Sequence, residues 1–329
     1  MKIKRLFYLS WEDALWDLLI HKKVPKNSTV LTPEFFCVDV ENNIRKHGYK
    51  VANYPVNGDL TVNQKIFLKC VHKYKPAVVV ILHANGITNN LIVNPVWLNK
   101  LSIDTILIED CVHRIIDPSK IRLLRKNHFM IDSLRKVLPL QGSNIWGSGD
   151  DLNYPLPPIW QSYKYGLTVT LLWAEMSFYW LLSLLNHRFG FKAEKTMEKG
   201  YDLIGDSLLP ARGWIIFRFL FDHIDQAWIR QIKRSQIMIY EKLLGKNFKT
   251  PYLATDRNEI RWWPLIFDDF HLANIILLNL RSAGNVVYFS LEGCKWTNKH
   301  KLLCLPLGPQ VRSRDIIDIC QIIKTALPA

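Results

Sequence analysis

Short apolar segments alternate with helical segments along the first half of the chain, and this alternation constrains the fold more than any other feature. Apolar runs of strand length, bounded by turn residues, lie at 28–31, 49–54, 77–82, 105–108 and 128–132. Helical periodicity fills the intervals at 10–20, 38–46 and 64–73. Ser10 is a plausible N-cap of the first helix, and Gly48 follows the end of the second. Strands that are apolar throughout are typical of a parallel sheet covered on both faces. We therefore predict an α/β protein built on a mostly parallel sheet.

The second half of the chain has a different pattern and suggests a second domain. A proline-rich stretch at 154–158 resembles a linker, and an apolar helix is predicted at 166–186. A basic helix at 226–246, strand character at 286–305 and a closing helix at 314–326 follow. We predict a large domain over residues 1–190 and a smaller α+β domain over residues 191–329.

Charge and cysteine content narrow the class of protein. The formal net charge is +14, but the basic residues are spread along the chain without a long block. This balance suits a nucleic acid, an anionic membrane or a phosphorylated small ligand, and no nucleic-acid-binding signature is present. The six cysteines form no C-x-x-C pair, which fits a reducing compartment. The basic N-terminus resembles a secretory signal, but Glu12, Asp13 and Asp17 interrupt its apolar stretch. We expect a cytoplasmic protein.

One segment is long enough to test as a membrane span. Residues 166–186 read GLTVTLLWAEMSFYWLLSLLN, with Glu175 near the middle. A charge at that depth costs roughly 2.5–3.5 kcal/mol on insertion scales. We therefore expect a buried or subunit-facing helix and no transmembrane span, while a peripheral membrane contact stays open.

Chemically capable residues follow three of the predicted strands. They are His83, the pair Glu109–Asp110, and Ser133 with Lys136. Ligands of open α/β sheets bind at the carboxyl ends of the strands, so these side chains should converge on a site. Taken alone, Asp110 fits a helix cap or an ion pair, and Lys136 fits a surface charge. The order of these residues along the chain distinguishes such structural roles from a ligand-binding site.

The run IEDCVHRIIDP, followed about twenty residues later by IDSLRKVLPLQGS, resembles the DegT/DnrJ/StrS family of sugar aminotransferases. In that family an E-D-x-x-[QH] strand end precedes a strand that carries a serine and then a lysine. The segments ILHANG, LTPEFFC and LCLPLGPQVRSRDIIDICQIIK follow the family's order as well. The resemblance covers nearly the whole chain, and its specific part lies at 108–142.

This resemblance implies a fold-type-I transferase that uses pyridoxal 5′-phosphate (PLP). Carried over by position, Lys136 is the catalytic Schiff-base lysine, and Asp110 faces the cofactor's pyridine nitrogen. The remaining implied cofactor contacts are His113 at the ring oxygen, Ser133 at the phosphate, His83 at its strand end, and Phe36 or Cys37 over the ring. The family also implies a homodimer, a nucleotide-linked keto-sugar as substrate and a separate amino donor.

The chain departs from the family pattern where the phosphate should bind. The family opens its first helix with small residues whose backbone N–H groups hold the phosphate. Here the matching run is WEDAL, which places the indole of Trp11 and the carboxyl group of Glu12 at that position. The glycine-rich stretch after the lysine is reduced to Gly142, and the usual G-x-N-x-R loop is missing. Arg212 or Arg218 could replace its arginine.

Three functions follow from these observations. The first is a PLP-dependent aminotransferase acting on a keto-sugar in surface-polysaccharide or related biosynthesis. The second is a catalytically degenerate relative that serves as a binding or partner subunit, because the phosphate position is altered. The third is a basic protein of nucleic acids or membrane surfaces, for which steep salt dependence of binding is expected.

Overall fold

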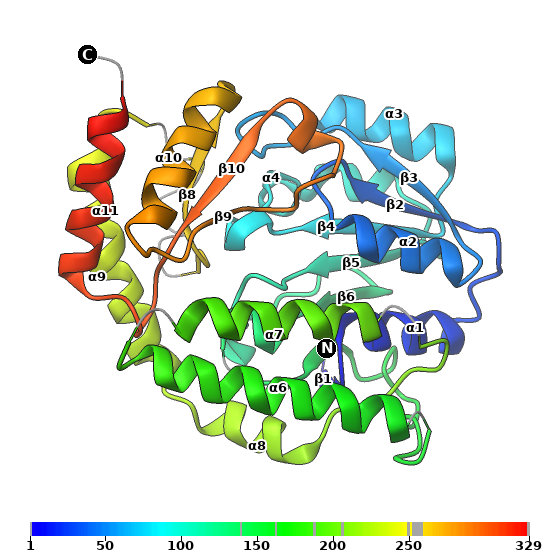
Figure 1. Ribbon diagram of the computed structural model, residues 1–329. Coiled ribbons are helices and arrows are strands. Elements are labelled where there is room, and N and C mark those ends of the chain that lie inside the picture. The colour runs from blue at the N-terminus through cyan, green and yellow to red at the C-terminus, as the bar shows by residue number, and fades with distance from the viewer. Residues whose placement is uncertain are drawn as a thin grey trace.

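A computed structural model describes residues 2–138, 140–161, 163–186, 189–204, 207–248, 251 and 259–327. The N-terminal half forms a seven-stranded sheet with helices on both faces, and the C-terminal helices gather beside it around a smaller sheet (Figure 1). This mixed α/β architecture confirms the predicted fold class. It also brings the carboxyl ends of the central strands toward the C-terminal half of the chain.

The large sheet has the strand order β1-β7-β6-β5-β4-β2-β3. Its strands are β1 (Ile3–Tyr8), β2 (Thr29–Pro33), β3 (Lys50–Tyr54), β4 (Val78–Leu82), β5 (Ile106–Asp110), β6 (His128–Ile131) and β7 (Ser143–Ser148). The pairs β3–β2, β2–β4, β4–β5 and β5–β6 are parallel, whereas β7 is antiparallel to both β6 and β1. The parallel strands therefore end at one edge, where β4 and β5 are in register through Leu82 and Asp110.

Alternate residues of the central strands supply two separate cores. Val78 and Val80 pack with helix α1 (Trp11–His21) and α2 (Val38–Lys46) on one face, in a core that continues into the smaller sheet. Val79 and Ile81 pack on the other face against α3 (Gln64–Tyr74) and α4 (Asn90–Val93). Because successive side chains of a strand point to opposite faces, a strand buried on both sides must be apolar throughout.

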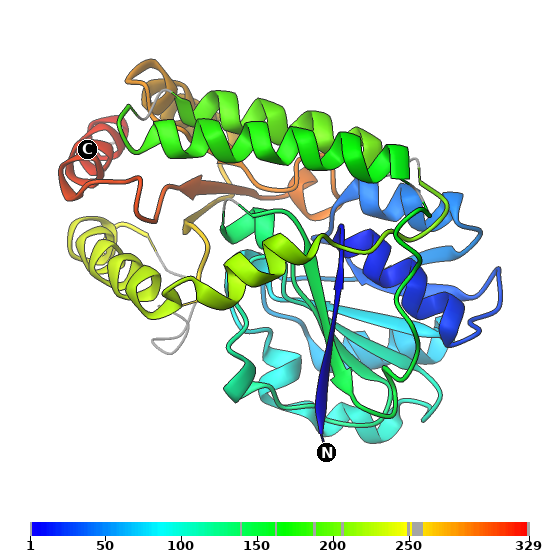
Figure 2. The ribbon, with the colours of Figure 1, turned by 90° about the horizontal axis from the view of Figure 1, so that it is seen from below.

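The C-terminal half packs around a three-stranded antiparallel sheet. Its order is β8-β10-β9, with β8 (Trp263–Phe267), β9 (Tyr288–Phe289) and β10 (Lys301–Leu305). The helices of this half and of the connection are α6 (Tyr163–Ser183), α7 (Phe189–Ile204), α8 (Ile215–His223), α9 (Gln226–Leu244), α10 (Phe270–Ser282) and α11 (Ser313–Ala326). Seen from below, α6 and α7 run side by side from the C-terminal helices to the N-terminal part (Figure 2).

Most predicted elements of the first half are present, and two strands were not predicted. Ser10 caps α1 as expected, since its side chain accepts a hydrogen bond from the Asp13 N–H. The unpredicted strands are β1, which the sequence analysis treated as a signal-like start, and the polar strand β7. Among the described helices, none is both long and apolar enough to cross a membrane.

Candidate active site at the strand ends

Lys136 lies in α5 (Leu134–Val137), a single helical turn that begins directly after strand β6. Its side chain lines a cavity together with Arg135 and Arg261. Burial lowers the pKa of Lys136 to about 7, and the positive charges of Arg261 and Arg135 lower it further. A large fraction of this amine is therefore unprotonated near neutral pH, which is the form that attacks a carbonyl carbon.

Asp110 ends strand β5 on the face that carries α1. Burial raises its pKa to about 7, the Val112 N–H lowers it by donating a hydrogen bond, and the carboxylate of Glu12 raises it again. The Lys136 charge also acts on Asp110, so the two groups lie within electrostatic reach of each other. The ionised form of such a buried carboxyl group is strongly stabilised when a cationic partner binds beside it, because the cation offsets the lost hydration of the carboxylate.

His113 lies beside the same lysine and is held in one orientation. Its Nδ1 accepts a hydrogen bond of 3.0 Å from the Asn85 N–H. Burial lowers the pKa of His113 well below its usual value, and the charges of Arg261 and Lys136 lower it further. The neutral ring that accepts at Nδ1 carries its proton on Nε2, so it can donate one hydrogen bond to a ligand.

Asn85 also connects the large sheet to the C-terminal half. Its side chain donates to the Trp262 carbonyl (2.7 Å) and accepts from the Trp262 N–H (3.1 Å), and its carbonyl accepts from the Arg261 N–H (2.9 Å). Gly86 is required beside it, because a Cβ atom there would lie 2.3 Å from the Glu259 carbonyl oxygen. This junction places the side chain of Arg261 next to Lys136.

Aromatic side chains close the site on the α1 side. Trp11 is buried edge-on against Phe36, with ring centroids 6.2 Å apart, and both belong to the core that contains α1. The Trp11 indole N–H lies close enough to the Asp110 carboxyl group to lower its pKa. Cys37 begins α2, and burial raises its thiol pKa while the Lys136 charge lowers it. Cys37 therefore lies within electrostatic reach of Lys136 and Phe36 packs against Trp11, while their place over the cofactor ring stays a prediction.

The first turn of α1 is rich in buried carboxyl groups. The Asp13 carboxylate accepts hydrogen bonds from the Ser10 hydroxyl (2.6 Å), the Ala211 N–H (3.0 Å) and the Tyr165 hydroxyl (3.1 Å). Glu12 is also buried, and its charge acts on Asp110, Lys136 and Arg135. Asp13 is bound within the protein, whereas Glu12 lies within electrostatic reach of all three of these site residues.

Donors for a phosphate are nevertheless present around this turn. The Trp11 and Glu12 N–H groups make no hydrogen bond within the described chain, as expected for the first residues of a helix. Ser133 is buried, and its side chain does not cap α5. Arg135 is buried, lies 4.9 Å above the Trp173 ring and is close enough to Glu12 and Asp13 to feel their charges. These groups fit the phosphate of PLP, with Glu12 opposing them.

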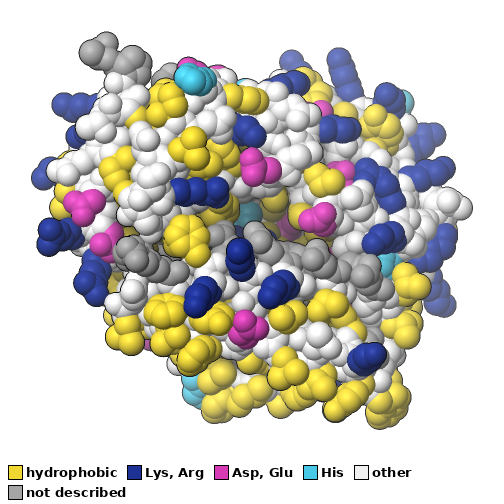
Figure 3. Space-filling model, in the orientation of Figure 1, with side chains coloured by type: hydrophobic (Ala, Val, Ile, Leu, Met, Phe, Trp, Pro, Cys, Tyr) yellow, Lys and Arg dark blue, Asp and Glu magenta, His cyan; other side chains and the backbone are white. Residues whose placement is uncertain are grey.

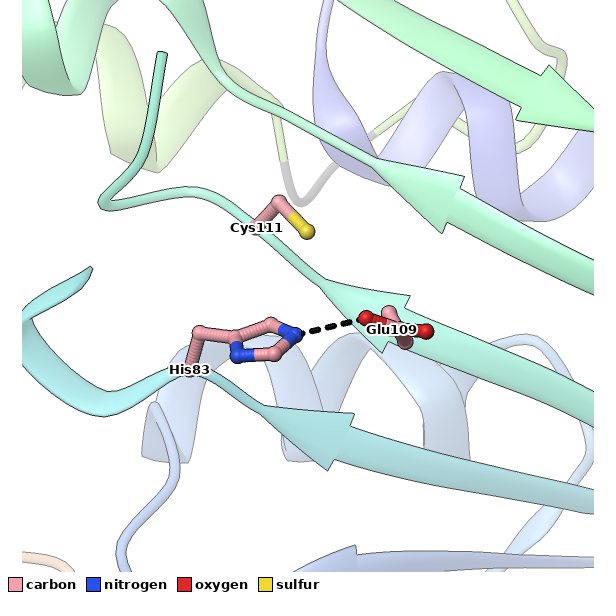
Figure 4. A group of neighbouring side chains, drawn as sticks. All are labelled: His83, Glu109 and Cys111. Carbon is pink, nitrogen blue, oxygen red and sulfur yellow. Dashed lines mark hydrogen bonds and ion pairs between the residues drawn. The ribbon is translucent and has the colours of Figure 1, made fainter. Parts of the chain in front are cut away.

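His83, another predicted site residue, belongs to a buried network around Glu109. Its Nε2 is 2.8 Å from one Glu109 oxygen, and His128 Nε2 is 2.8 Å from the other. Cys111 is close to His83 and Glu109 (Figure 4). These residue types can bind a transition metal, but the guanidinium of Arg114 lies 3.3 Å from His83 Nδ1 and opposes a cation there. The cluster is best described as a hydrogen-bond network that holds β4, β5 and β6 together, because each histidine accepts a backbone N–H at Nδ1 and directs Nε2 at Glu109.

Replacing Glu109 with alanine is expected to lower the free energy of unfolding by about 3–5 kcal/mol, because two buried histidines lose their partner. Burial alone would raise the Glu109 pKa, but hydrogen bonds with His128 and His83 lower it to about 2. Its contribution to stability is therefore complete above pH 4.5 and is lost as the pH falls toward 2. Urea unfolding at pH 7 measures the change. The exposed Glu292→Ala should cost less than about 1 kcal/mol. Equal losses in the two variants would contradict the network's role.

The sequence analysis missed two basic residues of the site. Arg261 and Lys233 line the cavity beside Lys136, although they lie about a hundred residues or more further along the chain. The unusual run RWWP at 261–264 was the one local signal that marked this segment. Their placement depends on the junction at Asn85, which no sequence pattern predicts.

No protein-family model matches this sequence, and no curated protein matches it either. The structure, in contrast, matches solved structures along almost its full length. A DegT DnrJ EryC1 StrS aminotransferase from Brucella abortus superposes with a TM-score of 0.61 at 13% identity, covering 98% of this chain and 85% of that chain. The chain has the fold of these aminotransferases.

Two further structures agree with this assignment of the fold. Spr1654 from Streptococcus pneumoniae, solved in its PLP form, superposes with a TM-score of 0.62 at 13% identity and covers 99% of this chain and 88% of that chain. Helicobacter pylori PseC, an aminotransferase involved in the biosynthesis of pseudoaminic acid, has a TM-score of 0.58 at 9% identity and covers 98% of this chain and 86% of that chain. The fold predicted from the residues at 108–142 is thereby confirmed.

Proposed function

We propose that this protein is a PLP-dependent aminotransferase that transfers an amino group to a keto-sugar. The observation that carries the proposal is the arrangement of Lys136 and Asp110, an amine with a pKa lowered to about 7 within electrostatic reach of a buried strand-end carboxyl group. A fold shared with aminotransferases and the cofactor form of Spr1654 support it. The role proposed for each residue toward the cofactor rests on the position of that residue in the site.

Each residue would have a distinct task toward the cofactor. Lys136 would hold the aldehyde carbon and, once released by the amino donor, would move a proton between the substrate carbon and the cofactor's C4′ carbon. Asp110 would keep the proton on the pyridine nitrogen, and His113 Nε2–H would donate to the ring oxygen. Bound PLP supplies an electron sink for the charge that develops on the substrate carbon. Trp11, Phe36 and Cys37 would exclude water from the ring.

The phosphate would bind between the start of α1 and Arg135, with the Ser133 hydroxyl as a further donor. Because Glu12 places a negative charge there, Glu12→Gln should tighten PLP binding by about tenfold or more. Pyridoxal, which lacks the phosphate, should gain clearly less than PLP, because Glu12 acts on it only through Lys136 and Asp110. Equilibrium titrations of absorbance measure the four affinities, with Glu292→Gln as the control for a general loss of charge. Equal tightening for pyridoxal would contradict a phosphate at this position.

We further propose that the protein is a homodimer in the cytoplasm. We also propose that the sugar acceptor is attached to a phosphate-containing carrier, and the family resemblance implies that this carrier is a nucleotide. Surface-polysaccharide biosynthesis is the proposed context. The space-filling view shows apolar side chains gathered over α6 and α8 (Figure 3). Large exposed residues there include Leu171, Phe178, Leu181, Ile215 and Phe219. Monomeric proteins seldom expose an apolar surface of this extent, which supports a subunit interface.

The half-reaction with an amino donor tests this function directly. Protein loaded with PLP should lose its visible absorption band when L-glutamate is added, and a keto-sugar should restore the band. The presence of buried carboxyl groups at the start of α1 favours the second candidate, a binding or partner subunit. A band that forms on Lys136 but does not respond to any amino donor would support that candidate and overturn the aminotransferase.

A further inference from the structure

A cavity of about 650 Å³ lies between α5 and the elements of the C-terminal half. Its volume is within the usual range of ligand pockets, about 300–1,000 Å³. Four basic side chains line it, namely Arg135, Lys136, Lys233 and Arg261. Arg135 and Lys136 have proposed roles toward the cofactor, whereas Lys233 and Arg261 lie beside them and have been given no ligand so far.

Lys233 and Arg261 are both buried, with exposed fractions of 5% and 8%. Among the described residues, neither makes an ion pair with a carboxylate. Lys233 Nζ donates one long hydrogen bond of 3.4 Å to the Ile260 carbonyl, and the Arg261 guanidinium lies 4.6 Å from the Trp262 ring centroid with its Nε–H unbonded. Burial lowers the pKa of Lys233 to about 8, and the neighbouring Arg261 lowers it further. The charge of Glu259, which is paired with Arg230, raises this pKa only in part. Two adjacent buried cations are costly unless an anion joins them.

The remaining wall of the cavity is mainly apolar. It includes Met176, Trp180, Trp228, Ile229, Tyr288 and Ile319. The three acidic residues of the lining lie nearer the surface: Asp225 caps the start of α9, Asp315 accepts a hydrogen bond from the Arg312 N–H at the start of α11, and Asp318 is exposed one turn further along α11. Trp228 is 50% exposed, so apolar surface continues from the cavity to the exterior. The cavity is therefore basic at its inner end and apolar along its sides.

We propose that this cavity binds a phosphate-bearing amphiphile, with the phosphate on Lys233 and Arg261 and an alkyl or isoprenoid body along the apolar wall. A phosphomonoester dianion, or the diphosphate that would link a sugar to a lipid carrier, matches two positive charges, whereas a carboxylate matches one. An apolar wall has few hydrogen-bonding groups for a nucleoside, and it gains from burying an alkyl chain. The inference rests on the proposed function in one respect. If the protein aminates a keto-sugar, the phosphate-bearing group that carries this sugar enters the cavity beside Lys136.

Calorimetric titration of the protein without cofactor tests the binding by itself. The probes are octyl phosphate below its micellar concentration, octanol, inorganic phosphate and uridine monophosphate. Octyl phosphate should bind at least about tenfold more tightly than each of the other three, because it alone satisfies both ends of the cavity. Tighter binding of the nucleotide would overturn the apolar carrier. Equal binding of octanol or of inorganic phosphate would overturn an amphiphile site.

Three variants assign the phosphate to its residues. Lys233→Met and Arg261→Met should each weaken octyl phosphate about tenfold or more, which corresponds to the loss of one charge-assisted contact. Arg234→Met is the matched control, because Arg234 is the exposed neighbour of Lys233 on the same helix, and it should leave the affinity unchanged. Lys233→Met should also keep or raise the melting temperature, since it removes a buried charge without shortening the side chain much. Equal losses in all three variants would overturn the assignment. Because these titrations need no cofactor, their failure would leave the aminotransferase proposal to its own half-reaction test.

Discussion

Replacing Lys136 with alanine is expected to abolish the visible absorption band with PLP and to reduce amino transfer by roughly 10⁴-fold or more, since one residue both holds the cofactor and moves the proton. Of the two lysines that line the cavity, Lys136 follows the strand end that carries the site, whereas Lys233 belongs to α9 and is not expected to take over. Arg135 and Arg261 carry guanidinium groups, which do not attack an aldehyde as a free amine does. The cavity loses a partly charged group, so the fold should tolerate the change.

Two companion variants make this result specific. Lys136→Arg keeps the positive charge but should be as inactive as the alanine variant, whereas Lys126→Ala removes an exposed lysine and should retain full activity. Absorbance spectra and steady-state rates of the four proteins give the comparison. Amino transfer by Lys136→Ala within tenfold of the unchanged protein would contradict the central role of this lysine.

Asp110→Asn is expected to act in opposite directions on activity and on stability. The asparagine cannot hold a proton on the pyridine nitrogen, so amino transfer should fall by roughly 10²-fold or more. The cofactor-free protein should become more stable above neutral pH, by about 1–4 kcal/mol, because a buried carboxylate is no longer ionised in the folded state. The Val112 N–H donates to residue 110 in both proteins, because an asparagine side chain also offers an acceptor oxygen.

The pH dependence of this gain follows from the direction of the pKa shift. Burial raises the Asp110 pKa from 3.8 in the unfolded chain to about 7 in the folded protein. Between these values the folded state binds more protons, so the original protein loses stability as the pH rises through that window. The advantage of Asp110→Asn should therefore grow from about pH 4 to about pH 7 and then level off. Urea unfolding across this range measures it, and a variant that is less stable at pH 8 would contradict the account.

Local sequence patterns predicted the central strands and the residues at their ends. The runs that became β4, β5 and β6 are apolar because both faces are covered, and this burial is legible without any tertiary information. Asp110, His113 and Lys136 follow these strands directly, so the topology alone brings them together. Strand β1 was missed because Lys4 and Arg5 interrupt its apolar pattern.

Strand β7 and the inner end of the cavity were missed for tertiary reasons. Strand β7 is polar yet buried, because Asp132 accepts hydrogen bonds from the Asn144 backbone (2.7 Å) and side chain (2.9 Å). Arg261 reaches the site through the contacts of Asn85 with a segment about 175 residues away, at Trp262. Hydrogen bonds between distant segments leave no periodic trace in a sequence.

The measurement that tests the account most directly is borohydride reduction of the PLP-treated protein, followed by peptide mapping. The account predicts one modified lysine, Lys136, with reduction blocked in Lys136→Ala and strengthened in Glu12→Gln at limiting PLP. Modification spread over exposed lysines, or no modification at saturating PLP, would contradict a cofactor site at the ends of β5 and β6.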